Sequence, residues 1–180
     1  MTSTWLKDEK ITLRAPEPED LELMYTMEND TTLWSAGNAT LPYSRYTLRA
    51  YLEESRQDLL TERQARFVIE LQGGCCAGMI DLADYDPINR RAEVCIGLLG
   101  KYRGEGIATR ALDLLCKYAA ERLHLHQLYA YIPEWNTASI ELFKKSGFTH
   151  SATLKEWQRG KEKYNDVILM QKVEKTDKNQ

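Results

Sequence analysis

Apolar and polar residues recur along this chain with two different periods, and the changes between them predict a series of strands and helices. Alternation at every second residue indicates a strand, and spacings of three and four indicate a helix. The first half opens with a strand at 11–15, closed by Pro16 and Pro18, and continues with a helix at 20–29. A second helix, capped by Ser44, is predicted to continue to Leu60. The loop between these helices, 30–43, is long enough to be functional.

The middle of the chain predicts an antiparallel meander of three strands. The β-rich runs 66–71 and 75–82 are separated by Gln72-Gly73-Gly74, which is a hairpin signal. A third run, 92–99, follows a turn at Asp86-Pro87.

The second half returns to alternating helices and strands. A helix is predicted at 106–122 and a strand at 127–132. Another helix starts at Asn136 and ends at Gly147. Two last strands, 148–156 and 164–173, flank a hairpin tip at Arg159-Gly160-Lys161. The order β-α-α-β-β-β-α-β-α-β-β predicts an α/β fold whose mixed, mostly antiparallel sheet carries helices on both faces.

Length and composition predict one domain. A chain of 180 residues can bury roughly 70% of its unfolded surface in a single core. We expect that domain at 1–173 and a polar, frayed tail at 174–180. Apolar stretches of about 18 residues and a signal-peptide pattern are both missing, so neither membrane spanning nor export is expected. The four cysteines form no Cys-x-x-Cys pair, which favours free thiols in the cytoplasm.

Charge and metal-ligand patterns narrow the function further. A net charge of −3, from 24 basic and 27 acidic residues, gives no electrostatic reason to expect a nucleic-acid partner. His124 and His126 have no evident third ligand, so no metal site is expected. Cys75 and Cys76 are most simply small apolar residues near a turn rather than a redox pair.

The most informative stretch joins the third meander strand to the next helix. Gly104 and Gly106 lie between the apolar run 94–99 and the helix, and they remove the Cβ atoms that would hold an anion at a distance. The first N–H groups of a helix lack intrahelical partners and carry a partial positive charge, so a phosphate binds well there. A Rossmann motif would need glycine where Thr109 stands, and the Gly-Lys-Ser/Thr of a P-loop is also missing.

Three motifs together resemble the GNAT superfamily of N-acetyltransferases. The loop is similar to its Gln/Arg-x-x-Gly-x-Gly/Ala signature, and the strand 91–97 looks like the one that precedes the loop in ribosomal-protein-alanine and spermidine acetyltransferases. Asn136-Thr137-Ala138-Ser139 and Leu142 to Phe148 resemble the Asn-x-x-Ser and Lys-x-Gly-Phe elements of the same branch. The predicted order of elements is also that of the GNAT fold.

The resemblance implies that acetyl-CoA binds along the strand, the loop and the later helix. Loop N–H groups would hold its pyrophosphate, strand amides its pantetheine arm, and a main-chain N–H the developing oxyanion. Asn136 and Ser139 would face the coenzyme together, and Lys145 would meet its phosphates. The implied coenzyme contacts are Ile96, Gly97, Leu98, Arg103, Gly104, Glu105, Gly106, Ile107, Ala108, Thr109, Asn136, Ser139, Phe143 and Lys145.

Catalysis requires an acceptor amine that has lost a proton, so a carboxylate is useful. Glu93 is the candidate base, although it could equally pair with Arg90 or Arg91 on the surface. Phe143 stands where many GNAT enzymes have a tyrosine that protonates the departing thiolate. Ser139, one helical turn earlier, is the candidate replacement, and unassisted thiolate departure is the alternative.

The acceptor is predicted to be a primary amine that attacks the thioester directly in a ternary complex. Clustered acids between the first two helices are typical of polyamine-acetylating relatives, whereas 35–45 contains no acid. We therefore expect a protein or peptide N-terminal amine, with a polyamine as the alternative and a non-catalytic coenzyme A-binding module as a third hypothesis. Trp34 and Tyr43, with Tyr46, form either an acceptor pocket or core packing. A homodimer or larger homo-oligomer is also compatible with the sequence.

Overall fold

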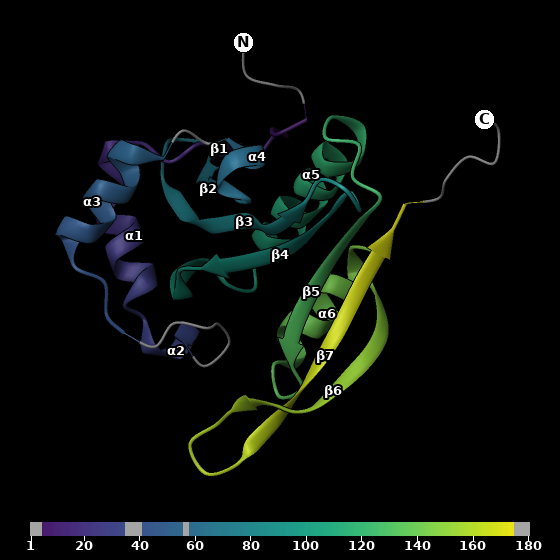
Figure 1. Cartoon of the computed structure of the whole chain (residues 1–180). Helices are drawn as coiled ribbons and strands as arrows, with labels where there is room; N and C mark the ends of the chain where they lie inside the picture. The colour runs from purple at the N-terminus through teal and green to yellow at the C-terminus, as the bar shows by residue number, and fades with distance from the viewer. Residues whose placement is uncertain (1–4, 35–40, 56–57, 175–180) are drawn as a thin grey trace.

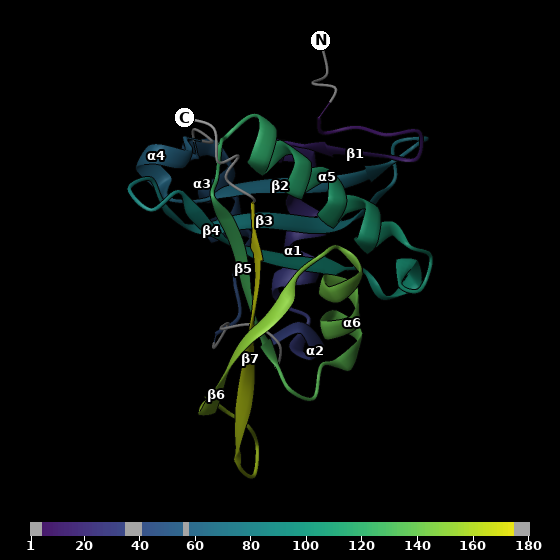
Figure 2. The same cartoon turned by 90° about the vertical axis from the view of Figure 1, so that its right-hand side faces the viewer.

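The computed structural model, described here for residues 5–34, 41–55 and 58–174, is a single twisted sheet with helices on both faces (Figures 1 and 2). Seven strands lie in the order β1-β2-β3-β4-β5-β7-β6, and only the β4–β5 pair is parallel. The strands are β1 (Ile11–Arg14), β2 (Ala65–Leu71), β3 (Cys76–Asp86), β4 (Arg91–Leu98), β5 (Gln127–Pro133), β6 (Thr149–Arg159) and β7 (Tyr164–Val173). The predicted fold class is therefore confirmed.

The helices divide between the two faces of the sheet. On one side lie α1 (Leu21–Glu28), α2 (Thr31–Trp34) and α3 (Arg45–Glu54), and on the other lie α5 (Ile107–Glu121) and α6 (Thr137–Lys145) (Figure 2). A short α4 (Leu59–Glu62) precedes β2. Single 3₁₀ turns occur at Pro18–Asp20 and Gly100–Tyr102.

Strand alternation fills an apolar core on each face. Ile80 and Leu82 of β3 are fully buried in the larger cluster with Leu112 and Leu115 of α5. Met79, which directly precedes Ile80, belongs to the smaller cluster, with Met24, Met27 and Leu48. Side chains alternate across a strand. Asp81 of β3 and Glu93 of β4 therefore lie on the same face of the sheet as Met79, the face that α1 and α2 cover.

Two local predictions were wrong. The second helix does not continue to Leu60: α3 ends at Glu54, and Leu60 lies in α4. Ser55 is extended, with ψ 124°, and the Asp58 carboxylate accepts a hydrogen bond from the Leu60 N–H at 3.1 Å, so a new helix cap replaces continuation. The predicted loop 30–43 also contains the helical turn α2, whose Thr32 N–H donates to the Asp30 carboxylate at 2.9 Å.

Other predicted boundaries agree within a few residues, except that β3 runs on to Asp86. Within the predicted loop, 35–40 lie outside the described residues, as do 175–180 of the predicted tail. In the described ranges, no helix is long and apolar enough to cross a membrane.

Candidate active site

The parallel strands β4 and β5 are paired over only three residues and then separate. Arg91, Ala92 and Glu93 pair with 127–129, whereas β5 continues in a long antiparallel pairing with β7. The divergence of β4 and β5 beyond Glu93 is visible in Figure 1. We call this divergence the fork, and Glu93 is the last paired residue before it.

One backbone edge of β4 faces into the fork. The Leu99 N–H donates to the Ala77 carbonyl at 2.9 Å, and the antiparallel β3–β4 register continues back from this pair. Because hydrogen-bonding direction alternates along a strand, the N–H groups of Ile96 and Leu98 point away from β3, toward the fork. Gly97 instead pairs with Met79. A Cβ at Gly97 would lie 3.0 Å from Met27 Cε, so this glycine leaves room for α1.

The glycine loop at the end of β4 is open to the surroundings at both glycines. Gly104 and Gly106 have φ of 82° and 77°, and a Cβ on either would meet nothing within 4 Å. Gly106 caps α5, whose first helical hydrogen bond runs from the Arg110 N–H to the Gly106 carbonyl at 3.2 Å. The preceding N–H groups, those of Ile107, Ala108 and Thr109, are therefore available to a ligand.

The two residues beside the glycines play different parts in this loop. Arg103 donates through Nε to the Leu98 carbonyl at 3.2 Å, which ties the loop to the end of β4. Glu105 is exposed at the tip. The open space over the glycines and the free edge of β4 fit a phosphate group joined to an extended, amide-containing arm.

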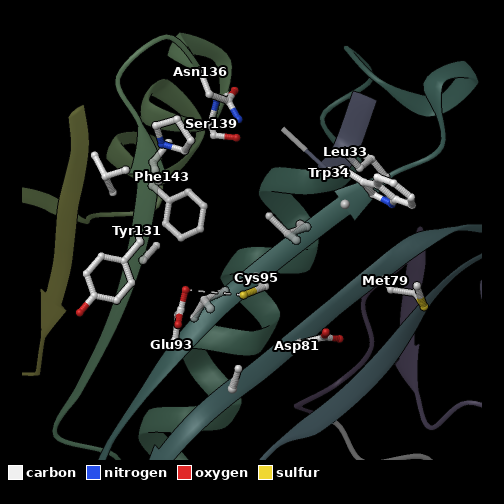
Figure 3. A pocket seen from close by; sticks show the side chains of 18 of the residues that line it. Leu33, Trp34, Met79, Asp81, Glu93, Cys95, Tyr131, Asn136, Ser139 and Phe143 are labelled. Carbon is white, nitrogen blue, oxygen red and sulfur yellow. Dashed lines mark hydrogen bonds between the residues drawn. The ribbon is translucent and has the colours of Figure 1, made fainter. Parts of the chain in front are cut away.

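A cavity of about 610 Å³ extends from the fork toward α1 and α2 (Figure 3). Its walls come from α1, α2 and α6 and from every strand except β1. The polar and aromatic side chains on these walls include those of Glu28, Trp34, Tyr43, Arg66, Asp81, Glu93, Cys95, Tyr131, Asn136, Ser139, Phe143 and Trp157.

Glu93 is half-buried on the wall of this cavity, at the start of the fork. The Cys95 S–H donates to Glu93 Oε1 at 3.8 Å (Figure 3). Burial raises the pKa of Glu93, the negative charge of Asp84 raises it further, and the Cys95 contact opposes both. Arg91, one of the two arginines that could have paired with Glu93 on the surface, contacts Asp86 at 3.3 Å. A carboxylate with a raised pKa in a cavity is suited to accept a proton.

The start of α6 places polar groups across the fork from β4. The Asn136 side chain accepts from the Ser139 N–H at 3.2 Å and so caps the helix. Ser139 lines the cavity, and Figure 3 shows its hydroxyl beside Asn136, on the far side of Phe143 from Glu93. Phe143 is only 3% exposed and packs edge-on against Phe148 at 4.9 Å. Lys145 is exposed and does not line the cavity, so its contact with coenzyme phosphates stays a prediction.

Trp34 and Tyr43 lie on the cavity wall, as one of the two hypotheses for them required. The Trp34 indole N–H donates to the Glu28 carbonyl. Asn29 fixes Tyr43 by accepting from its N–H at 2.9 Å and donating to its carbonyl at 3.0 Å. Tyr46 is 84% exposed and belongs to neither the core nor the cavity.

A charged cluster on the cavity wall was not among the residues predicted from the sequence. Arg66 donates to Glu28 at 2.7 Å and to Asp81 at 2.8 Å. Asp81 lies opposite Cys95 in the β3–β4 register, on the face that carries Glu93. A signal was present, because Arg66 and Asp81 interrupt two apolar strand runs. The aromatic residues Tyr131 and Trp157 also line the cavity and were missed.

Metal-ligating side chains do not gather within the described ranges: no group of three or more His, Cys, Asp or Glu side chains there could hold a metal ion. His124 has φ 54° and lies in the turn after α5.

Comparisons with known proteins agree with this geometry. The family model of the acetyltransferase (GNAT) domain matches residues 10–149. Spermidine N(1)-acetyltransferase of Escherichia coli K12 is 31% identical over 139 residues, 77% of this chain and 73% of the relative. A putative ribosomal N-acetyltransferase, YdaF of Bacillus subtilis, is 29% identical over 145 residues, 78% of this chain and 79% of the relative.

A solved structure is similar over nearly the whole chain. The crystal structure of spermidine N-acetyltransferase from Vibrio cholerae, in complex with CoA and spermine, superposes with a TM-score of 0.82 at 26% identity. The similarity covers 92% of this chain and 96% of that one. The chain belongs to the GNAT acetyltransferase family. It is an acetyl-CoA-dependent N-acetyltransferase, as its sequence motifs predicted.

Proposed function

We propose that this enzyme acetylates a primary amine of a small polycationic acceptor of the polyamine class. The observation that carries the proposal is the charge of the cavity. Its described lining residues include three carboxylates, those of Glu28, Asp81 and Glu93, but a single guanidinium, that of Arg66. This excess of negative charge favours an acceptor with more than one ammonium group.

The spacing of the carboxylates supports the same acceptor class. Asp81 and Glu93 occupy diagonal positions on one face of the β3–β4 pair, since Asp81 lies opposite Cys95. Such positions are roughly 7–8 Å apart. One carboxylate can therefore take the proton from the reacting nitrogen while the other binds the next nitrogen along the chain. Trp34, Tyr43 and Trp157 add aromatic faces that attract organic cations.

The proposed steps use groups on the cavity wall and in the loop before α5. Glu93 accepts the proton of the acceptor ammonium, directly or through water, and the neutral nitrogen attacks the thioester carbonyl. A backbone N–H of β4 at the fork stabilises the oxyanion. The coenzyme thiolate leaves with a proton from Ser139, or unassisted. Gly104, Gly106 and the first N–H groups of α5 bind the coenzyme phosphates.

A protein N-terminal amine, the expectation from the acid-free segment 35–45, is the second candidate. One relative, YdaF, is named a putative ribosomal N-acetyltransferase. The spermidine acetyltransferase relatives and the acidic cavity support the polyamine alternative better.

An acceptor panel tests the proposal. Spermidine, spermine, a monoamine of similar length and short peptides with free N-termini are compared by thiol release from acetyl-CoA, with products confirmed by mass spectrometry. We expect kcat/KM for the polyamines to exceed that for the monoamine and the peptides by roughly 100-fold, the contribution of one or two charge-assisted contacts. Peptides preferred over spermidine would overturn the proposal.

A matched pair of α1 variants tests the role of the acidic cavity. Glu28→Gln removes a carboxylate that lines the cavity, whereas Glu22→Gln removes an exposed one that pairs with Arg45 at 2.7 Å. We expect Glu28→Gln to raise KM for spermidine several-fold and to leave KM for the monoamine nearly unchanged. Glu22→Gln should change neither.

A further inference from the structure

A hydrogen bond behind Glu93 joins the two strands on either side of it. The Tyr129 hydroxyl of β5 donates to Asp84 Oδ2 of β3 at 2.8 Å. In the sheet register, Glu93 lies between these strands, opposite Ala83 on β3 and opposite Tyr129 on β5. The Tyr129–Asp84 hydrogen bond therefore spans β4 at the residue where the fork begins.

The backbone of β3 is distorted in a way that makes this bond feasible. In a regular strand, Asp84 would face the opposite side of the sheet from Ala83. The β3–β4 register shifts between Ala83 and Asp86, and Asp84 adopts a left-handed φ of 47°. This bulge turns the Asp84 carboxylate to the side where the Tyr129 hydroxyl reaches it. Such conformations cost free energy and persist where the surroundings fix them, often beside functional groups.

The Tyr129 side chain is fixed by burial and by packing against a neighbouring ring. It is 7% exposed and packs edge-on against Tyr131, with ring centroids 5.7 Å apart. Tyr131 lines the cavity on the same side as Glu93 (Figure 3). Asp84 does not line the cavity, so it is not placed to bind the acceptor itself.

We propose that Asp84 and Tyr129 are positioning residues for Glu93, which keep a second negative charge beside this carboxylate and hold both groups at the fork. The proposal rests on the assignment of Glu93 as the base in the proposed function.

The groups around Glu93 determine in which direction its pKa should change when the charge of Asp84 is removed. Asp84 faces Glu93 from β3, Cys95 from β4, and Tyr129 and Tyr131 from β5, and Asp81 lies beyond Cys95. Burial and the Asp84 charge both raise the pKa of Glu93. Removing that charge lowers this pKa, so Glu93 stays ionised to a lower pH and accepts a proton less strongly. The rate at neutral pH falls while the acid limb of the pH profile extends downward.

The first experiment measures kcat/KM for spermidine from pH 5.5 to 9 in Asp84→Asn. Asparagine tolerates left-handed φ best after glycine, so this variant keeps the bulge. We expect the ratio of kcat/KM at pH 5.5 to that at pH 8 to rise, because the acid limb moves to lower pH. Glu54→Gln, which removes an exposed charge at the end of α3, should leave the ratio unchanged. An unchanged ratio in Asp84→Asn would overturn the proposal.

Tyr129→Phe and a direct titration complete the test. Tyr129→Phe frees the Asp84 carboxylate to turn toward water, so the ratio should rise in the same direction, and the double variant should show no more than Asp84→Asn alone. Carboxyl NMR titration of Glu93 in the protein without substrates should show a lower pKa in Asp84→Asn than in the wild type. A loss of thermal stability with an unmoved Glu93 pKa would assign the pair a purely structural role.

Glu93→Gln separates this proposal from the one it rests on. If Glu93→Gln is inactive and the Asp84→Asn profile does not move, only the positioning role fails. If Glu93→Gln retains full activity, Glu93 is not the base, and both the catalytic assignment and the positioning role fail.

Discussion

At the scale of single residues, the proposed chemistry depends on one carboxylate and one hydroxyl on opposite sides of Phe143. Glu93 is the last residue of β4 that pairs with β5, and Ser139 lies in the first turn of α6. Phe143 is buried between them and cannot donate a proton. Proton removal from the acceptor and proton delivery to the thiolate are therefore assigned to different walls of the cavity.

Glu93→Gln keeps the shape of the side chain and removes its proton-accepting charge. We predict that kcat/KM at neutral pH falls by roughly 100-fold or more. The rate should recover as the pH approaches the pKa of the acceptor amine, because free amine then forms without help. A loss of only a few-fold across the pH range would return Glu93 to a structural role.

Ser139→Ala removes the hydroxyl that lines the cavity and leaves the Asn136 cap intact, because that cap uses the Ser139 backbone N–H. We predict that kcat falls several-fold while coenzyme affinity, measured by calorimetry, changes little. Phe143→Tyr, in the Ser139→Ala background, should restore activity by supplying a phenol at the cavity wall. Normal turnover by Ser139→Ala would instead favour unassisted thiolate departure.

Residues that belong to a sequence motif could be found from the sequence, and those assembled by strand pairing could not. Glu93 and Ser139 were predicted from motifs, and both line the cavity. Arg66 and Asp81 carry no motif and meet only because β2 pairs with β3. The Asp84 bulge arises from a register shift, which local patterns do not report.

At the scale of elements, the loop before α5 combines two properties that can be tested separately. Gly104 and Gly106 both have positive φ, which strains any residue with a side chain, and both face open space. A larger side chain in either position should therefore cost some stability and should also occupy the space available to the coenzyme phosphates.

We predict that Gly104→Val and Gly106→Val lose most of their acetyl-CoA affinity, because each charge-assisted hydrogen bond to phosphate is worth about 1.5–3 kcal/mol. Gly73→Val is the matched control: Gly73 has φ 100°, faces open space and lies in the β2–β3 hairpin. All three variants should lose similar thermal stability, and only the first two should lose calorimetric affinity. Equal acetyl-CoA affinity in all three variants would show that the coenzyme phosphates bind elsewhere.

Helix boundaries show where periodicity is an incomplete guide. The apolar spacing continues through Leu59 and Leu60, yet α3 stops at Glu54, since Asp58 caps a separate turn. A capping side chain inside a periodic run can therefore start a new helix where the period alone would continue the old one. The caps at Ser44 and Asn136 were predicted correctly, and each accepts a backbone N–H at the start of its helix.

At the scale of the whole molecule, the order of the strands and of the longer helices followed from the sequence, whereas the residue at which β4 and β5 separate did not. Strand order and parallel or antiparallel direction depend on contacts between distant segments, and 91–98 reads as one uniform strand. Only the register shows that three of its residues pair with β5. Self-association, one of the expectations from the sequence, stays a prediction.

Hydrogen exchange can observe the fork directly. We predict that the amides of Ile96 and Leu98, which point into the fork, exchange rapidly in the free protein and slowly with acetyl-CoA bound. The amides of Gly97 and Leu99, which face β3 in the same strand, should be protected in both states. Equal protection of all four amides without coenzyme would contradict the described register.

The fork also predicts that coenzyme binding stabilises the folded protein. Only three residue pairs join β4 to β5, so the two halves of the sheet share few hydrogen bonds. A ligand bound in the fork would add contacts to both halves. A ligand at 100 times its Kd stabilises the folded state by about 2.7 kcal/mol. When acetyl-CoA is scarce, the enzyme should therefore become easier to unfold and degrade, so that the supply of donor sets the amount of catalyst as well as its rate.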